Sequence, residues 1–247
     1  MKLFALAMCL LISCCTAIGC ASASPSTASN SSLATARVHV IAKPKAGVKE
    51  PLVRVAVYDA APAQSTNTGS GKYERVDYNN LTDVMVWLEP KGKTASATPA
   101  ATDIVFTSLN ESDHIHPASI GQTIHFRNKT SRTLNLYSVS EGNEFELPTI
   151  APGASAAYVP KSEGYIEVLF DPAKPPIAAL YVAPSPWIAH THSNKTVTFS
   201  DVPPGEYDVV TWHPRLPGST SSINLRAGQI SEASVTVGVS ALSNASQ

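Results

Sequence analysis

Histidines are the side chains of this sequence whose types and spacing could bind a metal ion. Two of them form the doublet His114-x-His116, and two more form His190-x-His192. Residues two apart in an extended strand point to one face, so each doublet could chelate one ion. If the doublets converged with His213 close by, the site would suit zinc or copper(II) without sulfur. The better supported interpretation is structural or solvent-exposed histidines, because His116 precedes a proline at an expected turn and the second doublet lies in a polar connection.

Thiol chemistry is confined to the first twenty residues. All the cysteines lie there, at Cys9, Cys14, Cys15 and Cys20, so the rest of the chain has no thiol. A folded part without cysteine can form neither a disulfide nor a metal–thiolate bond.

Other catalytic patterns are missing from the sequence. No Gly-x-Ser-x-Gly motif and no glycine-rich phosphate loop occurs. The acidic side chains that could act in catalysis are scattered along the chain, and they are Asp113, Glu141, Glu144, Glu146 and Asp171. We therefore expect no enzyme activity. The net charge is −1 and only 15% of residues are charged, so we expect no nucleic acid as a partner.

The first residues predict export. A Met-Lys start and an apolar run over residues 3–12 are typical of a secretory signal, which we assign to residues 1–20. Residues 11–14 (LISC) and 17–20 (AIGC) both resemble bacterial lipobox sequences, and we favour lipidation of Cys20 over Cys14, whereas residues 21–23 (ASA) would suit ordinary signal peptidase. The expected location is the periplasm or cell envelope, with a lipid anchor as the only link to a membrane.

The remaining residues predict an all-β fold. Short apolar runs, many of them alternating with polar residues, are typical of half-buried strands, and they lie at 38–41, 53–58, 84–88, 123–126, 165–169, 179–182, 196–199, 207–212 and 233–237. Prolines and glycines fall mainly between these runs and indicate turns. The weakest stretches, 60–72 and 93–102, are expected to be surface loops or domain joints.

The motifs in the second half of the chain follow one another in an order that resembles a known family. The motifs are 120–128 (IGQTIHFRN), 135–138 (NLYS), 145–147 (FEL), 151–155 (APGAS), 164–171 (GYIEVLFD), 179–182 (ALYV), 201–207 (DVPPGEY) and 212–214 (WHP). This order resembles the periplasmic plastocyanin-like proteins often labelled methylamine-utilisation proteins, a cupredoxin family. The resemblance implies a cupredoxin-like Greek-key β-sandwich.

The same resemblance implies that the copper ligands are replaced. In that family a histidine and a Cys-Asp-x-His-Pro-x-Met loop form the copper site. Here Leu134 stands at the first histidine position and Phe170 at the cysteine position. Ala173 stands at or near the second histidine, and Pro176 near the methionine. Because blue copper needs a thiolate, a type 1 copper site is excluded.

The segments on either side of this part predict a second sandwich. Residues 84–90 resemble the strand before the cupredoxin part in this family, and residues 199–207 resemble a hairpin of transthyretin-like, carboxypeptidase-regulatory domains. A sheet with too few strands cannot cover its own core, so we expect the two segments to pair across the insertion. The expected organisation is a disordered tether at 21–35, half-sandwiches at 36–92 and 193–240, the cupredoxin-like domain at 103–185, and a disordered tail at 241–247.

These features predict a non-catalytic binding or structural module without a cofactor. Its expected partner is an envelope protein or a surface ligand. Two alternatives stay open. One is a sulfur-free copper- or zinc-binding protein that uses the histidine doublets. The other is a carbohydrate-binding module, suggested by the sandwich architecture and by Trp87, Trp187 and Trp212.

Overall fold

The computed structural model describes residues 32–44, 76–92, 97–110 and 114–238. All regular elements in these ranges are β-strands, which confirms the all-β prediction. The search of the described residues for a long apolar helix that could cross a membrane finds none. The signal peptide with Cys14 and Cys20, the predicted strand at 53–58 and the tail at 241–247 lie outside the described residues.

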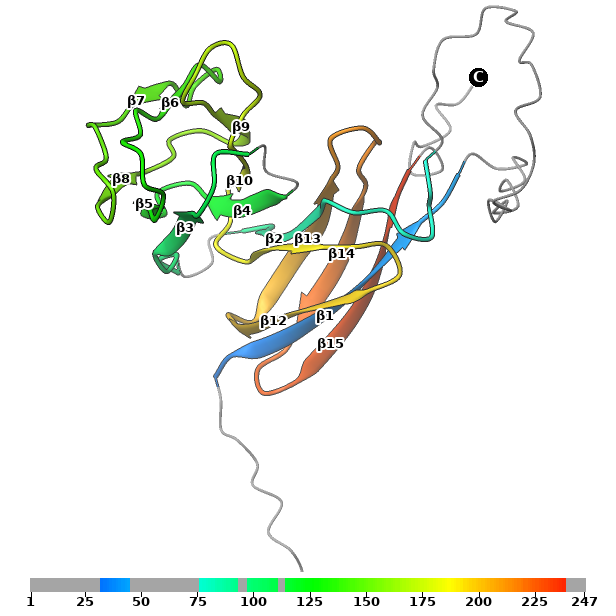
Figure 1. Cartoon of the computed structure of the whole chain (residues 1–247). Coiled ribbons are helices and arrows are strands. Elements are labelled where there is room, and N and C mark those ends of the chain that lie inside the picture. The colour runs from blue at the N-terminus through cyan, green and yellow to red at the C-terminus, as the bar shows by residue number, and fades with distance from the viewer. Residues whose placement is uncertain (1–31, 45–75, 93–96, 111–113, 239–247) are drawn as a thin grey trace, which may run out of the picture. The chain divides into compact units, whose positions relative to one another are not determined.

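The first sandwich, which we call the outer sandwich, is built from both ends of the folded chain. Its strands are β1 (Ala34–Ala42), β2 (Val84–Pro90), β11 (Ile188–Thr191), β12 (Thr196–Val202), β13 (Gly205–Trp212), β14 (Thr220–Leu225) and β15 (Ile230–Val237). One sheet has the order β12-β1-β15, with β1 antiparallel to β12 and parallel to β15, and Figure 1 shows the blue β1 beside the red β15. The other sheet is antiparallel, in the order β11-β2-β13-β14. Strands that precede and follow the insertion therefore pair in both sheets.

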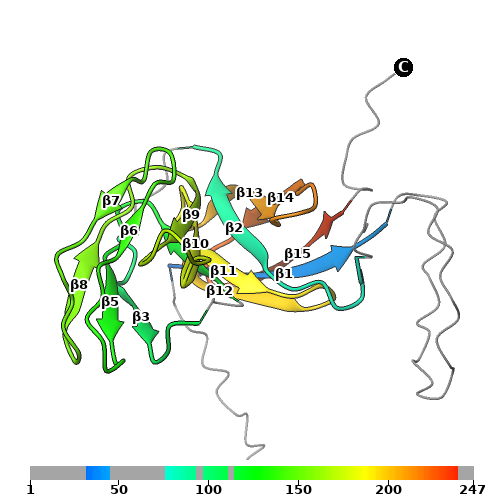
Figure 2. The ribbon, with the colours of Figure 1, turned by 45° about the horizontal axis from the view of Figure 1, so that its top comes forward.

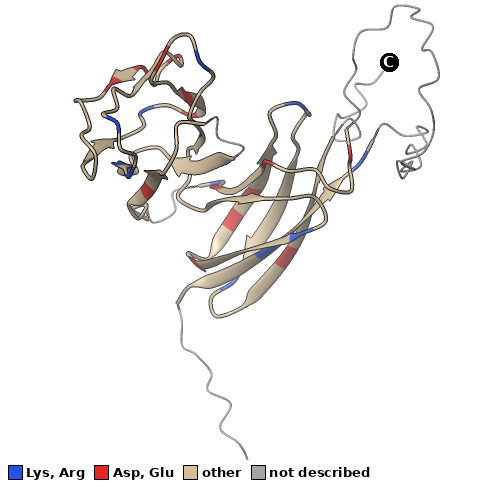
Figure 3. Ribbon diagram, in the orientation of Figure 1, with Lys and Arg blue, Asp and Glu red and all other residues tan. Residues whose placement is uncertain are grey.

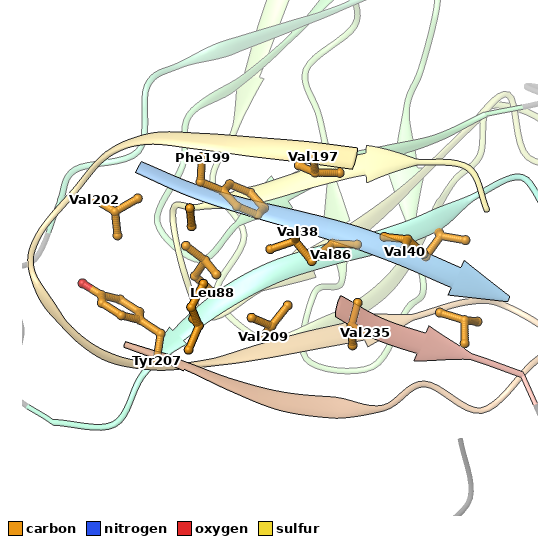
Figure 4. Close-up of a cluster of buried hydrophobic side chains, with 14 of the residues drawn as sticks. Val38, Val40, Val86, Leu88, Val197, Phe199, Val202, Tyr207, Val209 and Val235 are labelled. Carbon is orange, nitrogen blue, oxygen red and sulfur yellow. The ribbon is translucent and has the colours of Figure 1, made fainter. Parts of the chain in front are cut away.

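Alternating side chains form the core of the outer sandwich. In β1 every second residue is buried, so Val38 and Val40 point inward, and valines with Phe199 and Tyr207 fill the space between the sheets (Figure 4). This alternation is the pattern of a strand with one face on a core and one toward solvent. Because β1 begins at Ala34, the last two residues of the predicted tether belong to the folded sheet.

The second sandwich, which we call the inserted sandwich, lies between β2 and β11 in the sequence. Its strands are β3 (Thr102–Phe106), β4 (Ile115–Ser119), β5 (Ile124–Asn128), β6 (Tyr137–Ser138), β7 (Phe145–Glu146), β8 (Ser155–Tyr158), β9 (Gly164–Val168) and β10 (Ala178–Ala183). Its sheets have the orders β4-β10-β9 and β3-β5-β8, and β6 pairs with β7. Figure 2 shows β3, β5 and β8 side by side. A second apolar cluster around Phe126, Leu136 and Ile166 forms its core.

A third apolar cluster, the junction cluster, joins strands of the two sandwiches. Met85 and Trp87 from β2 meet Tyr181 and Ala183 from β10, and the ring centroids of Trp87 and Tyr181 are 5.5 Å apart. Trp212 stacks on Tyr181 with a centroid distance of 4.3 Å. This contact explains why β2 and β10 are continuous apolar runs, since each is covered on both faces. The described residues accordingly form one compact unit.

Two strands correct the sequence-based expectations. His116 and Pro117, expected at a turn, lie inside β4, which pairs in parallel with β10. His190, expected in a polar connection, lies in β11, which pairs with β2 and extends the outer sandwich. Both strands are short and half-polar, so their apolar pattern is too weak to show in the sequence, and pairing with a buried neighbour orders them.

Candidate functional site

Apolar side chains stand at the four positions that the sequence analysis aligned with copper ligands. The Leu134 side chain is 1% exposed and lies in the second apolar cluster. Its backbone N–H donates to the Ile150 carbonyl at 3.0 Å, and its carbonyl accepts from the Ile150 N–H at 2.8 Å. Phe170 packs against the same cluster, whereas Ala173 is exposed and Pro176 is half-buried. No polar atom of these four side chains is available to a metal.

The buried amide of Asn128 fixes the loop that presents Leu134. Its Nδ2 donates to the backbone carbonyls of Arg132, at 2.7 Å, and of Ile150, at 2.9 Å. Its Oδ1 accepts from the Thr130 N–H at 3.0 Å and from the Thr130 hydroxyl at 2.8 Å. Because these bonds hold the backbone on both sides of Leu134, the loop cannot open without leaving buried polar groups unpaired.

The two histidine doublets do converge. The ring centroids of His190 and His192 are 5.4 Å apart, and those of His190 and His114 are 6.3 Å apart. His116 is close enough to His114 and His190 that their charges contribute to lowering its pKa, after the larger effect of burial. We call His114, His116, His190 and His192 the histidine cluster. Its residues lie directly before and at the start of β4 in the inserted sandwich, and in and directly after β11 of the outer sandwich.

A carboxylate missed by the sequence analysis orients this cluster. Asp83 Oδ1 lies 3.1 Å from His190 Nε2, and Oδ2 accepts from the Thr82 hydroxyl at 2.9 Å. The side chains of His190 and Asp83 are 22% and 19% exposed, so their contact is partly shielded from water. Asp83 also has a φ of 57°, in the left-handed region that few non-glycine residues adopt. Its only signal in the sequence is its position directly before the apolar strand β2.

Opposing effects act on the charge of Asp83. Burial acts to raise the pKa of this carboxyl, but hydrogen bonds from Thr82, His190 and the Ile115 backbone N–H outweigh it and lower the pKa. Asp83 is therefore ionised near neutral pH. The Ile115 N–H belongs to β4, so Asp83 accepts hydrogen bonds from both sandwiches.

His213, expected to lie near a metal, hydrogen-bonds to the protein backbone instead. It is 5% exposed, and its Nδ1 accepts from the Arg215 backbone N–H at 3.1 Å. The ring also hydrogen-bonds to the backbone of Thr82. Burial, followed by the positive charge of Arg215, lowers the pKa of His213. Both ring nitrogens thus have protein partners, which gives His213 a structural role.

A surface pocket of about 350 Å³ adjoins the histidine cluster. Its lining is polar and consists of Asn79, Asn80, Thr82, His192, Ser193, Asn194 and Lys195. His192 itself is exposed, so one edge of the cluster is open to solvent. Among the described residues, no three His, Cys, Asp or Glu side chains are already arranged around a point where an ion would sit.

The tryptophans occupy structural positions. Trp87 is 3% exposed in the junction cluster, Trp212 packs against the same cluster, and Trp187 packs against the core of the outer sandwich. Tyr165, at 39% exposed, stacks on Trp212 and is the outermost ring of this series. The three indoles are therefore not gathered into an exposed platform on which a sugar could stack.

Charged residues of both signs are spread over the described strands and loops (Figure 3). Individual ion pairs form between Lys91 and Asp208 at 2.9 Å and between Arg127 and Asp103 at 2.6 Å. Such partly exposed pairs contribute little to stability.

Comparison with known proteins finds similarity among solved structures. No family model matches the chain, and no curated protein matches it. Among solved structures, a purple cupredoxin from Nitrosopumilus maritimus is 20% identical, with a TM-score of 0.24 over 28% of this chain and 76% of that chain. A point mutant of amicyanin in its oxidised form is 12% identical, with a TM-score of 0.26 over 41% of this chain and 99% of that chain.

Proposed function

We propose that this chain is an exported, non-catalytic binding or structural protein whose inserted sandwich is cupredoxin-like but has no type 1 copper site. The observation that supports this is the packing of Leu134, which is 1% exposed among apolar side chains at the position of a copper-binding histidine in the resembling family. With Phe170 on the same cluster, the end of the sandwich is closed by packing.

The chemistry of the side chains supports the same conclusion. The sequence has no cysteine after Cys20, so the folded part offers no thiolate to a cupric ion. A sulfur-free site can bind copper, but it cannot give the electronic structure of a blue-copper centre. The proposed role is therefore contact with a protein or another component of the cell envelope, without electron transfer.

Copper loading tests this proposal. The exported chain without residues 1–20, which carry all four cysteines, is titrated with CuSO₄, and the visible absorption spectrum is recorded at each step. We expect no intense thiolate-to-copper band at any copper concentration. An intense band that persists after every free metal ion has been removed by gel filtration would overturn the proposal.

Export and lipidation need a separate test. We propose cleavage before Cys20 and attachment of a lipid to its thiol. Mass spectrometry of the mature protein from a bacterial host should find a diacylglycerol-modified N-terminal Cys20, and Cys20→Ala should abolish the modification whereas Cys14→Ala should leave it. An unmodified N-terminus at residue 21 or later would refute the anchor.

A further inference from the structure

The histidine cluster contains none of the residues aligned with copper ligands, and its surroundings are polar. It joins His114 and His116 of the inserted sandwich to His190 and His192 of the outer sandwich. Packed apolar side chains explain the burial of the neighbouring junction, but nothing in the fold requires several imidazoles to meet there. Neutral imidazoles are the preferred protein ligands of borderline divalent ions.

We propose that His114, His190 and His192 form a sulfur-free binding site for Zn²⁺ or Cu²⁺ that joins the two sandwiches. The distances between the rings suit this role. Zn–N bonds of about 2.0–2.1 Å place the centroids of two ligating imidazoles roughly 5–6 Å apart in a tetrahedral site. The distance of 5.4 Å between His190 and His192 falls in this range, and the distance of 6.3 Å between His190 and His114 lies above it, so the ring of His114 must move toward the ion on binding.

Ring rotation completes the site. The described side chains are not yet arranged around an ion. The χ2 torsion of histidine is broad and roughly two-fold, so rotation about it can turn a ring nitrogen toward the ion without moving the backbone. His192 is exposed at the edge of the polar pocket of about 350 Å³, which gives a hydrated ion a way in.

Asp83 is assigned as the positioning residue. Its Oδ1 lies 3.1 Å from His190 Nε2, so the Nε2–H donates to the carboxylate and Nδ1 is left to face the ion. A carboxylate that accepts from the non-ligating nitrogen fixes the tautomer and raises the basicity of the ligand, and losing it typically costs about 10–100-fold in metal affinity. The backbone of Asp83 has a left-handed φ of 57°, a conformation that costs free energy and persists where the surrounding structure holds it.

His213 is excluded from the ligand set because both of its nitrogens have backbone partners. His116 lies beside the three ligands and is the candidate for a fourth position. If it does not bind, water fills that position, as it does in open zinc sites with three protein ligands.

The test is metal binding by the chain without residues 1–20, whose four cysteines would also bind zinc and copper, and without a polyhistidine tag. ZnCl₂ and CuSO₄ are titrated by isothermal calorimetry into the original chain and into His190→Ala/His192→Ala. His39→Ala/His125→Ala is the matched control, because it removes two histidines that lie outside the cluster. We expect one equivalent of metal on the original chain and on the control, and at least a 100-fold weaker affinity in the cluster variant.

Two further variants keep the result interpretable. His192→Ala truncates an exposed side chain, so this variant should fold normally. It should weaken metal binding, and it replaces the double variant in the test if the double variant does not fold. Asp83→Asn should weaken binding by about 10–100-fold. The expected optical signature with copper is a weak ligand-field band, which is distinct from the intense thiolate band that would overturn the proposed function. Equal affinity in the original chain and in His192→Ala, or no binding by the original chain, would overturn the metal site.

Discussion

Truncating Leu134 to alanine probes whether packing closes the end of the inserted sandwich. The side chain is 1% exposed, so its removal deletes apolar atoms that have no contact with water. Leu→Ala changes in cores cost about 2–5 kcal/mol in the free energy of unfolding, and the loss grows with the volume of the cavity that remains. The paired backbone hydrogen bonds between Leu134 and Ile150, at 3.0 Å and 2.8 Å, hold the backbone beside the Leu134 side chain in place. The cavity cannot collapse, and we expect a loss of about 3–4 kcal/mol.

Urea unfolding followed by far-UV circular dichroism measures this loss. The midpoint should fall while the slope with denaturant stays constant, since the change acts on stability and leaves the exposed area unchanged. The matched control is Val139→Ala, because Val139 is 71% exposed, and its effect should stay within about 0.5 kcal/mol. A loss below about 1 kcal/mol for Leu134→Ala would refute the reasoning, because it would mean that open space already lies beside the side chain.

Three further predictions follow from buried polar groups and close contacts. Asn128→Ala should lower the free energy of unfolding by about 2–4 kcal/mol, because it removes all four hydrogen bonds of a buried amide. Asn135→Ala on the surface should cost less than about 1 kcal/mol. Urea midpoints compare the two variants, and equal losses would count against the role of Asn128. Burial lowers the pKa of His116 below its usual 6.5, so the folded protein binds this proton less readily than the unfolded chain does. The free energy of unfolding should therefore be highest above pH 6.5 and should decrease as the pH falls below that value. Unfolding midpoints measured with chelator at about pH 7.5 and about pH 5.5 should show this loss, and His116→Gln should reduce it; an unchanged pH dependence would contradict the assignment. Gly218→Ala should lower the thermal unfolding midpoint, because an added Cβ would meet the Thr211 carbonyl oxygen; an unchanged midpoint would show that the backbone gives way there.

Much of the fold could be predicted from local patterns. The runs at 84–88, 179–182 and 207–212 correspond to β2, β10 and β13, because strands with apolar residues on one or both faces leave a clear trace in the sequence. The strands β4 and β11, like β3, β8 and β14, were missed. The strand β4 contains Pro117, and both β4 and β11 are short and half-polar. Their order comes from pairing with β10 and β2, which are buried neighbours.

Only part of the candidate metal site could be predicted from local sequence patterns. The spacing of each histidine doublet predicts that its two rings share a face, and the contact between His190 and His192 agrees with this. Whether the doublets meet depends on how the two sandwiches contact each other, and no local pattern encodes that contact. Likewise, nothing near Trp-His-Pro indicates that Arg215 and Thr82 satisfy the ring of His213.

The sequence by itself determined which atoms this protein can use. The part of the chain after Cys20 contains no cysteine and hence no thiolate, and no arrangement of its strands can supply one. The tertiary structure alone decided which of the remaining groups meet. Asp83 and His190 are 107 positions apart, and they lie 3.1 Å apart because β2 and β11 pair in one sheet. Composition is a covalent property of the chain, whereas proximity follows from strand pairing over long separations, which only the packed core enforces.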